Sequence, residues 1–190
     1  MEKSALRSQL RSMRLALTQD ERMRLSRRAC NHILRSEPWN RSGCVALYIA
    51  VRGETDAAPL LQNAWESGKT VLLPVCSPET KGVMRLRPCP GPEALRPGLY
   101  GIPEPVVDEN GAPAPPPDLV IVPGVAFTDR GGRLGQGGGY YDRLLAAPEH
   151  ARAFRMGLAY GFQLLPALPV EAWDCAMHAV ATEKGIIWMT

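Results

Sequence analysis

The stretch 131–142 reads G-G-R-L-G-Q-G-G-G-Y-Y-D and constrains the fold more than any other part of the chain. Six of its first nine residues are glycine. An apolar run, Leu119–Val125, precedes it and a helix-compatible run, Tyr140–Ala147, follows it. A strand, a glycine loop and a helix in this order direct backbone N–H groups and a helix N-terminus at an anion. Glycine also lets the backbone approach a ligand without a Cβ in the way.

This pattern favours a phosphate-binding loop, with a flexible surface loop as the alternative. A loop that needed only flexibility would not need Arg133, Tyr140, Tyr141 and Asp142. The stretch has no G-K-[ST] as a Walker A loop would, and it is not a G-x-G-x-x-G turn with an acid ~20 residues later. Loop N–H groups and the Arg133 guanidinium together suit phosphate.

The length of 190 residues is enough for one domain with a proper core, so we expect a single domain over residues 1–190. The hydrophobic fraction of 45% and the charged fraction of 22% are ordinary for a soluble globular protein. A net charge of +3 suits an anionic small molecule and is too weak to predict a nucleic-acid partner.

The five cysteines are scattered without a C-x-x-C pair, which argues against a disulfide framework and a zinc site. Reduced thiols in the cytoplasm are the simplest interpretation. No apolar run is long enough to span a bilayer. The N-terminal segment lacks the apolar core of a secretory signal; it is Arg-rich and amphipathic like a transit peptide, but it continues into the next helix.

A helix is predicted over residues 2–17, where an apolar row and a basic row run side by side at helical spacing. The two rows are Leu6, Leu10, Met13 and Leu17, and Lys3, Arg7, Arg11 and Arg14. Each arginine by itself is expected on a solvated face. Cations at the N-terminal end oppose the helix dipole at a cost of ~0.3–1 kcal/mol each, which a nearby anion would offset.

The rest of the chain predicts an α/β fold. A capping box, Thr18–Glu21, opens a second helix over Gln19–Ser36 that Pro38 ends, and both N-terminal helices are expected to cover a sheet. The other predicted elements are strands at Cys44–Ala50, Thr70–Cys76, Met84–Arg87, Leu119–Val125, Arg155–Tyr160, Ala179–Thr182 and Gly185–Trp188, a helix at Ala57–Ser67, and a stiff Pro-rich connection over Pro88–Pro117.

Residues 44–76 have the length of a βαβ unit, which implies parallel strands. Ligands bind beyond the carboxyl ends of such strands, and Glu54 stands at one of these ends. Asp142 is a candidate Mg²⁺ ligand. Tyr140 and Tyr141 would either stack on a flat heterocycle or belong to the core. From the residues alone, the chain is predicted to be a nucleotide-using enzyme whose acceptor is not specified.

Five motifs stand in the order of one family: K-x-x-L-R at 3–7, G-E-T-D at 53–56, Y-G-I-P-E-P at 100–105, P-G-V-A-F with the glycine stretch at 123–142, and L-P-V-x-x-W-D at 168–174. The chain resembles the 5-formyltetrahydrofolate cyclo-ligase family nearly end to end. The resemblance implies a three-layer α/β/α fold with a mostly parallel sheet, similar to the NagB/RpiA/CoA-transferase-like fold. It also implies ATP- and Mg²⁺-dependent cyclisation of 5-formyltetrahydrofolate to 5,10-methenyltetrahydrofolate. ADP and phosphate are released, after phosphorylation of the formyl oxygen and attack by N10.

The resemblance also implies roles for individual residues. ATP would be held by Lys3, Arg7, Arg133, Leu134, Gly135, Gln136, Gly137, Gly138, Gly139, Tyr140 and Tyr141; folate by Ile49, Glu54 and Tyr140; Mg²⁺ by Asp142 and Asp174; and Arg133 and Glu54 would act in catalysis. Many members carry a basic residue in place of Gly138, and some also in place of Gln136. The remaining cations of this chain should therefore neutralise a larger share of the phosphate charge.

Two alternatives stay open. One is an ATP-binding paralogue with a changed substrate or a non-enzymatic role. The other is a module whose N-terminal arginines grip nucleic acid, against which stand the modest charge and the lack of a basic and aromatic patch. We expect reduced folate and ATP as the partners, no nucleic acid or membrane, and a monomer.

Overall fold

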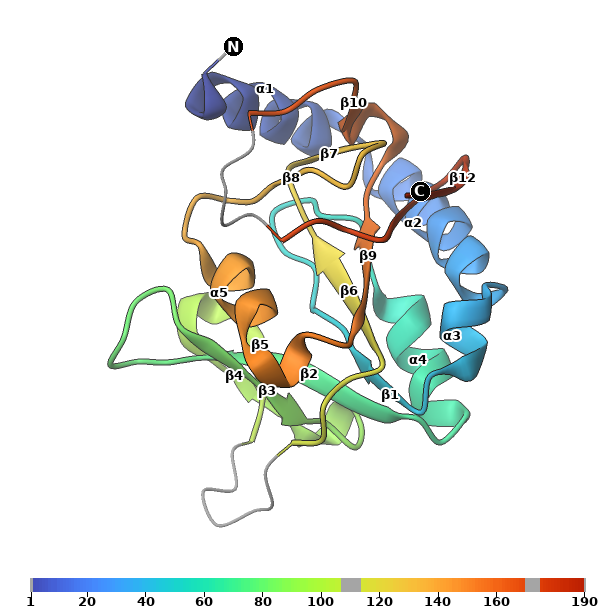
Figure 1. The fold of residues 1–190 in the computed structure, drawn as a ribbon, viewed down its shortest axis with the longest axis vertical. Coiled ribbons are helices and arrows are strands. Elements are labelled where there is room, and N and C mark those ends of the chain that lie inside the picture. Colours follow the sequence, from blue (N-terminus) through green and yellow to red (C-terminus); the bar gives the residue numbers. More distant parts are fainter. Residues whose placement is uncertain (1, 107–113, 170–174, 190) are drawn as a thin grey trace.

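A seven-stranded sheet runs through the centre of the molecule in the order β12-β11-β9-β6-β1-β2-β3 (Figure 1). The computed structural model describes residues 2–106, 114–169 and 175–189. The strands are β1 Cys44–Ala46, β2 Thr70–Cys76, β3 Met84–Pro88, β6 Leu119–Pro123, β9 Phe154–Leu158, β11 Ala179–Thr182 and β12 Gly185–Trp188. The inner pairings are parallel, and β3 and β12 are antiparallel edges. The predicted mostly parallel sheet is confirmed.

Helices cover both faces of this sheet. On one face lie α2 (Gln19–Leu34), α3 (Glu37–Arg41) and α4 (Ala58–Glu66), and α5 (Tyr140–Ala146) lies on the other (Figure 1). Successive strand residues point to opposite faces. Val45 accordingly belongs to the core cluster under α2 and α4, and Ala46 to the cluster under α5. Because both faces are covered, the inner strands are continuous apolar runs.

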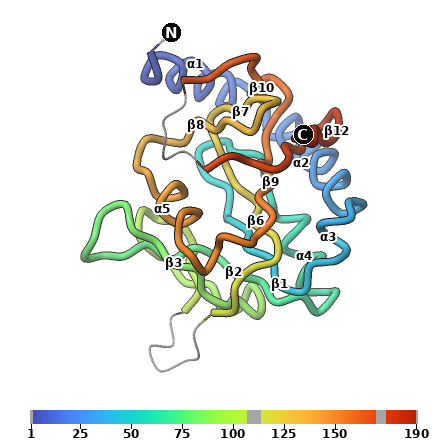
Figure 2. Tube along the Cα trace, in the orientation of Figure 1, coloured from blue at the N-terminus to red at the C-terminus, as the bar shows by residue number. Residues whose placement is uncertain are grey.

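Helix α1 (Lys3–Ala16) packs elsewhere. Its Leu6 and Leu10 contact Val125 and, in a second, three-stranded sheet, Ala126 and Leu134, and Figure 2 shows these segments together at one end of the molecule. That sheet consists of β10, β7 and β8, at Leu164–Leu165, Ala126–Thr128 and Arg133–Leu134. Both N-terminal helices cover a sheet, as expected, but periodicity identifies only an apolar face and did not indicate that α1 packs on this second sheet.

Several boundaries differ from those predicted. The first strand ends at Ala46 and not at Ala50, although the Leu47 N–H still donates to the Leu72 carbonyl of β2 at 2.9 Å. Pro38 lies in the first turn of α3, where a proline is tolerated, and it does not end α2. The capping box Thr18–Glu21 is present as predicted.

The Pro-rich connection contains strands that its composition did not indicate. It forms an antiparallel pair, β4 (Leu95–Pro97) and β5 (Pro103–Pro105), before the chain enters residues 107–113, which lie outside the described part. Short 3-10 turns complete the fold at Pro92–Ala94, Leu99–Gly101, Pro148–His150 and Gly161–Gln163.

Two further expectations concern cysteines and membranes. All five cysteines are free, as predicted, so the fold uses no disulfide. Across residues 2–106, 114–169 and 175–189, no helix combines the length and apolarity needed to cross a membrane.

Candidate functional site

A pocket of about 460 Å³ opens at the carboxyl ends of β1, β2 and β6. Its walls come from the loop after β1, the end of β2, the hairpin of β4 and β5, and the segment from β8 into α5. The structure thus brings most of the predicted site residues together, namely Ile49, Glu54, Arg133, Gly135, Gln136, Gly138, Gly139, Tyr140, Tyr141 and Asp142. Lys3, Arg7, Leu134 and Gly137 are not among its lining residues, and Asp174 lies outside the described residues.

The glycine stretch divides into two parts with different roles. Gly131 and Gly132 form the turn between β7 and β8, where the Thr128 N–H donates to the Gly132 carbonyl at 2.9 Å. Gly131 has φ +83, and a Cβ there would lie 2.6 Å from the Met177 carbonyl oxygen. The prediction of one continuous anion loop over 131–142 is therefore wrong in its first half, because Arg133 and Leu134 are a strand.

Of the glycines in this stretch, only Gly135, Gly138 and Gly139 line the pocket. Gly137 and Gly139 have φ of +102 and +68, which L side chains rarely adopt. Gly139 is the N-cap of α5, and this helix has only seven residues. The exposed N–H groups of the loop, more than a long helix dipole, are therefore what this segment offers to an anion.

Helix α1 braces this loop from outside the pocket. Arg7 donates from Nε to the Gly135 carbonyl at 2.8 Å. Arg11 donates to Gln136 twice, from Nε to Oε1 at 2.9 Å and from Nη2 to the backbone carbonyl at 3.0 Å. The basic row thus reaches the loop, but these two arginines contact its oxygens in the structure.

Arg133 places a buried cation at the pocket wall. Its side chain is 4% exposed, and Nη2 pairs with Oδ1 of Asp142. Nη1 donates to the Pro123 carbonyl at 3.4 Å, and Nε is buried with no hydrogen-bond partner. A guanidinium with donors to spare beside a glycine loop can take a further charge-assisted bond to an oxyanion.

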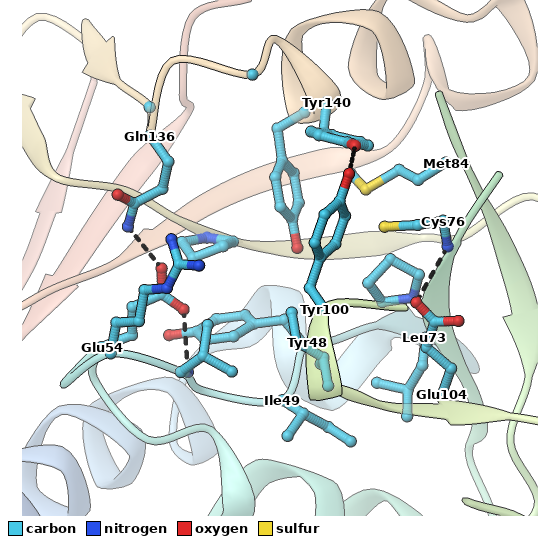
Figure 3. Close-up of a pocket in the computed structure, with 18 of the residues that line it drawn as sticks. Tyr48, Ile49, Glu54, Leu73, Cys76, Met84, Tyr100, Glu104, Gln136 and Tyr140 are labelled. Carbon is cyan, nitrogen blue, oxygen red and sulfur yellow. Dashed lines mark hydrogen bonds between the residues drawn. The ribbon is translucent and has the colours of Figure 1, made fainter. Parts of the chain in front are cut away.

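Glu54 stands opposite, on a turn formed by Arg52 and Gly53 with φ of +52 and +73. Its Oε1 accepts from Nε2 of Gln136 at 3.0 Å, and its Oε2 accepts from the Val51 N–H at 3.3 Å (Figure 3). Burial raises the pKa of Glu54, while the Gln136 hydrogen bond and then the charge of Arg14 oppose this rise.

A hydroxyl pair and a second acid lie on the remaining walls. The hydroxyls of Tyr100 and Tyr140 are 3.0 Å apart, and Oε1 of Glu104 accepts from the Cys76 N–H at 3.2 Å (Figure 3). Tyr100 and Glu104 were not predicted as site residues. The sequence feature that could have identified them is the turn Y-G-I-P-E-P, which contains both residues and in which Tyr100 takes φ +61.

Arg14 was also missed, and for it the expectation of a solvated face is wrong because its side chain is fully buried. It follows Leu6 and Leu10 at i+4 spacing, in the line of buried residues on α1. Met13, which the sequence placed in the apolar row, is instead 41% exposed.

The carboxylates of the pocket limit which metal it suits. No group of three or more His, Cys, Asp or Glu is placed to hold a metal within the described residues. Asp142 borders the loop and is 27% exposed at its side chain. A carboxylate beside a glycine loop suits Mg²⁺, which takes one or two carboxylates together with water and ligand oxygens, better than a metal caged by protein ligands.

The chain is similar to known proteins in sequence and in fold. The sequence model of the 5-formyltetrahydrofolate cyclo-ligase family matches residues 1–183. The 5-formyltetrahydrofolate cyclo-ligase of Escherichia coli (strain K12) is 36% identical over 179 residues, which cover 93% of this chain and 98% of that protein. That of Haemophilus influenzae is 33% identical over 177 residues, covering 92% and 94%.

Solved structures show the same fold. Aquifex aeolicus 5,10-methenyltetrahydrofolate synthetase superposes with a TM-score of 0.84 at 36% identity, over 100% of this chain and 93% of that one. A 5,10-methenyltetrahydrofolate synthetase from Mycoplasma pneumoniae gives a TM-score of 0.72 over 96% of this chain and 99% of that one. At 23% identity it supports the fold alone.

Proposed function

The chain belongs to the 5-formyltetrahydrofolate cyclo-ligase family, and from that membership we propose how its pocket performs the family's reaction. The activity is the ATP-dependent conversion of 5-formyltetrahydrofolate to 5,10-methenyltetrahydrofolate. The observation that carries the assignment of residues is the 3.0 Å hydrogen bond between Gln136 and Glu54. It brings the glycine loop and the buried acid to one pocket, so two substrates bound at them would lie next to each other.

The loop from Gly135 to Gly139 and Arg133 form the phosphate end of the pocket in this proposal. The loop contributes backbone N–H groups, and Arg133 contributes a guanidinium that is already desolvated. Lys3 and Arg7 would add positive charge from the side. Leu134 and Tyr141 belong to the same end, with Tyr141 5.7 Å from the Arg133 guanidinium.

The folate end lies around Glu54. Its carboxylate would accept hydrogen bonds from pterin N–H groups, and the side chains of Ile49 and Tyr140 would pack against the ring system. The supporting geometry is the burial of Glu54, whose side chain is 8% exposed. A hydrogen bond to an ionised acceptor in such a place is stronger and more selective than one in water.

The chemistry explains why phosphate and folate sites must meet. A formamide oxygen is a poor leaving group. In the proposed first step that oxygen attacks the γ-phosphorus of ATP, its O–P bond forms, the bond to the β-phosphate oxygen breaks, and ADP leaves. N10 then attacks the formyl carbon and loses its proton, the carbon–oxygen bond breaks, and phosphate departs. Phosphoryl transfer depends on positioning and charge neutralisation, which the loop and Arg133 provide without a nucleophilic side chain.

Asp142, together with Asp174, is proposed to hold Mg²⁺ against the phosphates of ATP. When bound, the ion would supply further neutralisation of phosphate charge. The Asp142 carboxylate is also paired with Arg133. Asp142 therefore also orients the guanidinium at the phosphate end.

We further propose a monomeric, cytoplasmic single domain that uses no nucleic-acid or membrane partner. The central sheet, which takes strands from residue 44 to residue 188, supports one domain, and five free thiols suit a reducing compartment. Light scattering on the purified protein should give a mass near 20.7 kDa. A mass of twice that value would contradict the monomer.

The activity is tested by incubating the protein with 5-formyltetrahydrofolate and Mg²⁺, with and without ATP, and following the ultraviolet absorbance of the methenyl product. We expect an ATP-dependent rise that EDTA abolishes and excess Mg²⁺ restores. ATP binding without any rise would favour the paralogue with a changed substrate. A rise that does not depend on ATP would contradict the proposed reaction.

A further inference from the structure

Arg14 is a fully buried cation that has no role in the chemistry proposed above. It lies on α1, with a side-chain exposure of 0%. Its Nη1 is 4.0 Å from Oε1 of Glu54 and donates to the Gly124 carbonyl at 3.4 Å. Its Nε and Nη2 are buried without a hydrogen-bond partner. A buried guanidinium with two unsatisfied donors is costly, so its presence needs an explanation.

Packing alone does not explain an arginine at this position. Leu6 and Leu10 precede it in the same line on α1, and an apolar residue would continue that line without burying a charge. The backbone next to Glu54 is instead shaped to approach Arg14. At Gly53, with φ +73, a Cβ would lie 3.4 Å from the Arg14 carbonyl oxygen, so this turn lies directly against α1.

We propose that Arg14 is a positioning residue: it holds the Glu54 carboxylate ionised and oriented toward the pterin of the bound folate, without itself touching the substrate. This inference rests on the proposed role of Glu54. Arg14 does not line the pocket. It therefore acts through Glu54, on the side away from the ligand.

Several charged and titratable groups face the Glu54 carboxylate. Arg14 faces it from α1 and Arg52 from its own turn, and Gln136 faces it from the glycine loop. Two tyrosines also face it, the buried Tyr48 from the loop after β1 and the partly buried Tyr141 from α5. Arg11 lies close enough to Arg14 to oppose its charge, and Tyr160 lies beside both Arg14 and Glu54. Of these groups, Arg14 is the fully buried cation, so water screens its effect least.

The sign of the effect follows from the two charges. Burial raises the pKa of Glu54, and Arg14 opposes that rise by favouring the ionised carboxylate. Without Arg14 the pKa of Glu54 rises further, and a larger fraction of Glu54 is protonated at neutral pH. A protonated carboxyl presents a donor to the N–H groups of the pterin, so folate binding weakens. Raising the pH ionises Glu54 again and restores binding.

The test measures the Kd of 5-formyltetrahydrofolate without ATP, by calorimetry between pH 6 and pH 9. We expect Arg14→Gln to bind about tenfold more weakly at pH 7, a loss of about 1.4 kcal/mol in binding free energy, and to recover toward the wild-type value by pH 9. Arg14→Lys should keep most of the affinity at neutral pH. The control Arg27→Gln removes an exposed arginine of α2 and should leave the whole profile unchanged.

A double-mutant cycle separates this role from a purely structural one. In a Glu54→Gln background position 54 no longer titrates, so Arg14→Gln should change the Kd little further and add no pH dependence. A loss of affinity in Arg14→Gln that is equal at every pH, or one that persists fully in the Glu54→Gln background, would overturn the proposal. Unchanged affinity in Arg14→Gln would overturn it as well.

Folding of the variants is itself informative. If Arg14→Gln alone does not fold, the double variant Arg14→Gln/Glu54→Gln should fold, because it leaves no uncompensated buried carboxylate. If the double variant also fails, Arg14→Lys decides: a loss of affinity in Arg14→Lys that is equal at every pH between 6 and 9 would contradict the proposal. Because these measurements use binding without ATP, they stay distinct from a failure of the proposed reaction, which would show as absent turnover in the wild type.

Discussion

Arg133 is the first residue of the two-residue strand β8, just before the glycine loop, and its guanidinium is buried at the pocket wall and paired with Asp142. If this guanidinium neutralises charge during phosphoryl transfer, Arg133→Ala should lower kcat at saturating ATP by at least about 10²–10³-fold. The control is Arg130→Ala, which removes an exposed arginine from the same hairpin. Wild-type kcat in Arg133→Ala would contradict the phosphate assignment.

The cysteines give a second prediction for single residues. Burial raises the pKa of Cys30 to about 12 and that of Cys44 to about 11. Since the thiolate is the reactive form, both should resist labelling by a thiol reagent at pH 8 in the native protein. The less buried Cys76 and Cys175 should react first. Mass spectrometry of labelled peptides checks this, with the denatured protein as the control. Rapid labelling of Cys30 in the native protein would contradict the burial of this thiol.

Individual site residues were predictable to different degrees. Arg133 and Glu54 were found because each follows an apolar strand, at the edge where ligands of α/β sheets bind. Arg14 was missed because a basic residue within an amphipathic helix is usually solvated. Its burial depends on Glu54, which is 40 residues away in the sequence, and helical periodicity carries no information about that contact.

At the scale of elements, the glycine stretch is a turn, a strand and a loop in succession, and its two ends should respond differently to mutation. Gly131→Ala places a Cβ against the backbone of Met177 and should lower stability by more than the ~1–2 kcal/mol of an unfavourable left-handed residue, with the KM for ATP unchanged. Gly139→Ala should raise the KM for ATP, because it displaces the loop and the Arg143 side chain that packs on it.

Thermal unfolding and steady-state kinetics on the same two variants measure the two effects. The matched control is Gly68→Ala, which has φ +72 but no neighbour within 4 Å of the added Cβ and lies away from the pocket. A large increase in the KM for ATP in Gly131→Ala would show instead that the whole stretch, Gly131 included, belongs to the nucleotide site.

Elements were predicted well where their apolar pattern is long. The strand Thr70–Cys76 and the closing pair Ala179–Thr182 and Gly185–Trp188 were predicted with the boundaries that the structure shows. The hairpins of β4 with β5 and of β7 with β8 were not predicted. Their strands are only two or three residues long, so no alternation is long enough to recognise.

At the scale of the whole molecule, sheet topology assembles the site. Strands β1 and β6 are neighbours although they are about 75 residues apart, and they deliver Glu54 and the glycine loop to the same edge. Helix α1 then reaches both, through Arg11 on Gln136 and Arg14 beside Glu54. The α/β class and the common edge could be predicted from the βαβ pattern. The bracing by α1 could not, because it depends on a second sheet formed from short segments.

The central claim is that the formyl oxygen receives the γ-phosphoryl group in this pocket, and isotope transfer tests it most directly. The wild-type enzyme is incubated with ATP, Mg²⁺ and 5-formyltetrahydrofolate labelled with ¹⁸O in the formyl group, in unlabelled water, and the released phosphate is analysed by mass spectrometry. We expect one ¹⁸O atom in each phosphate released, because the labelled formyl oxygen leaves with the phosphate. Unlabelled phosphate, formed at the same rate as the methenyl product, would contradict it.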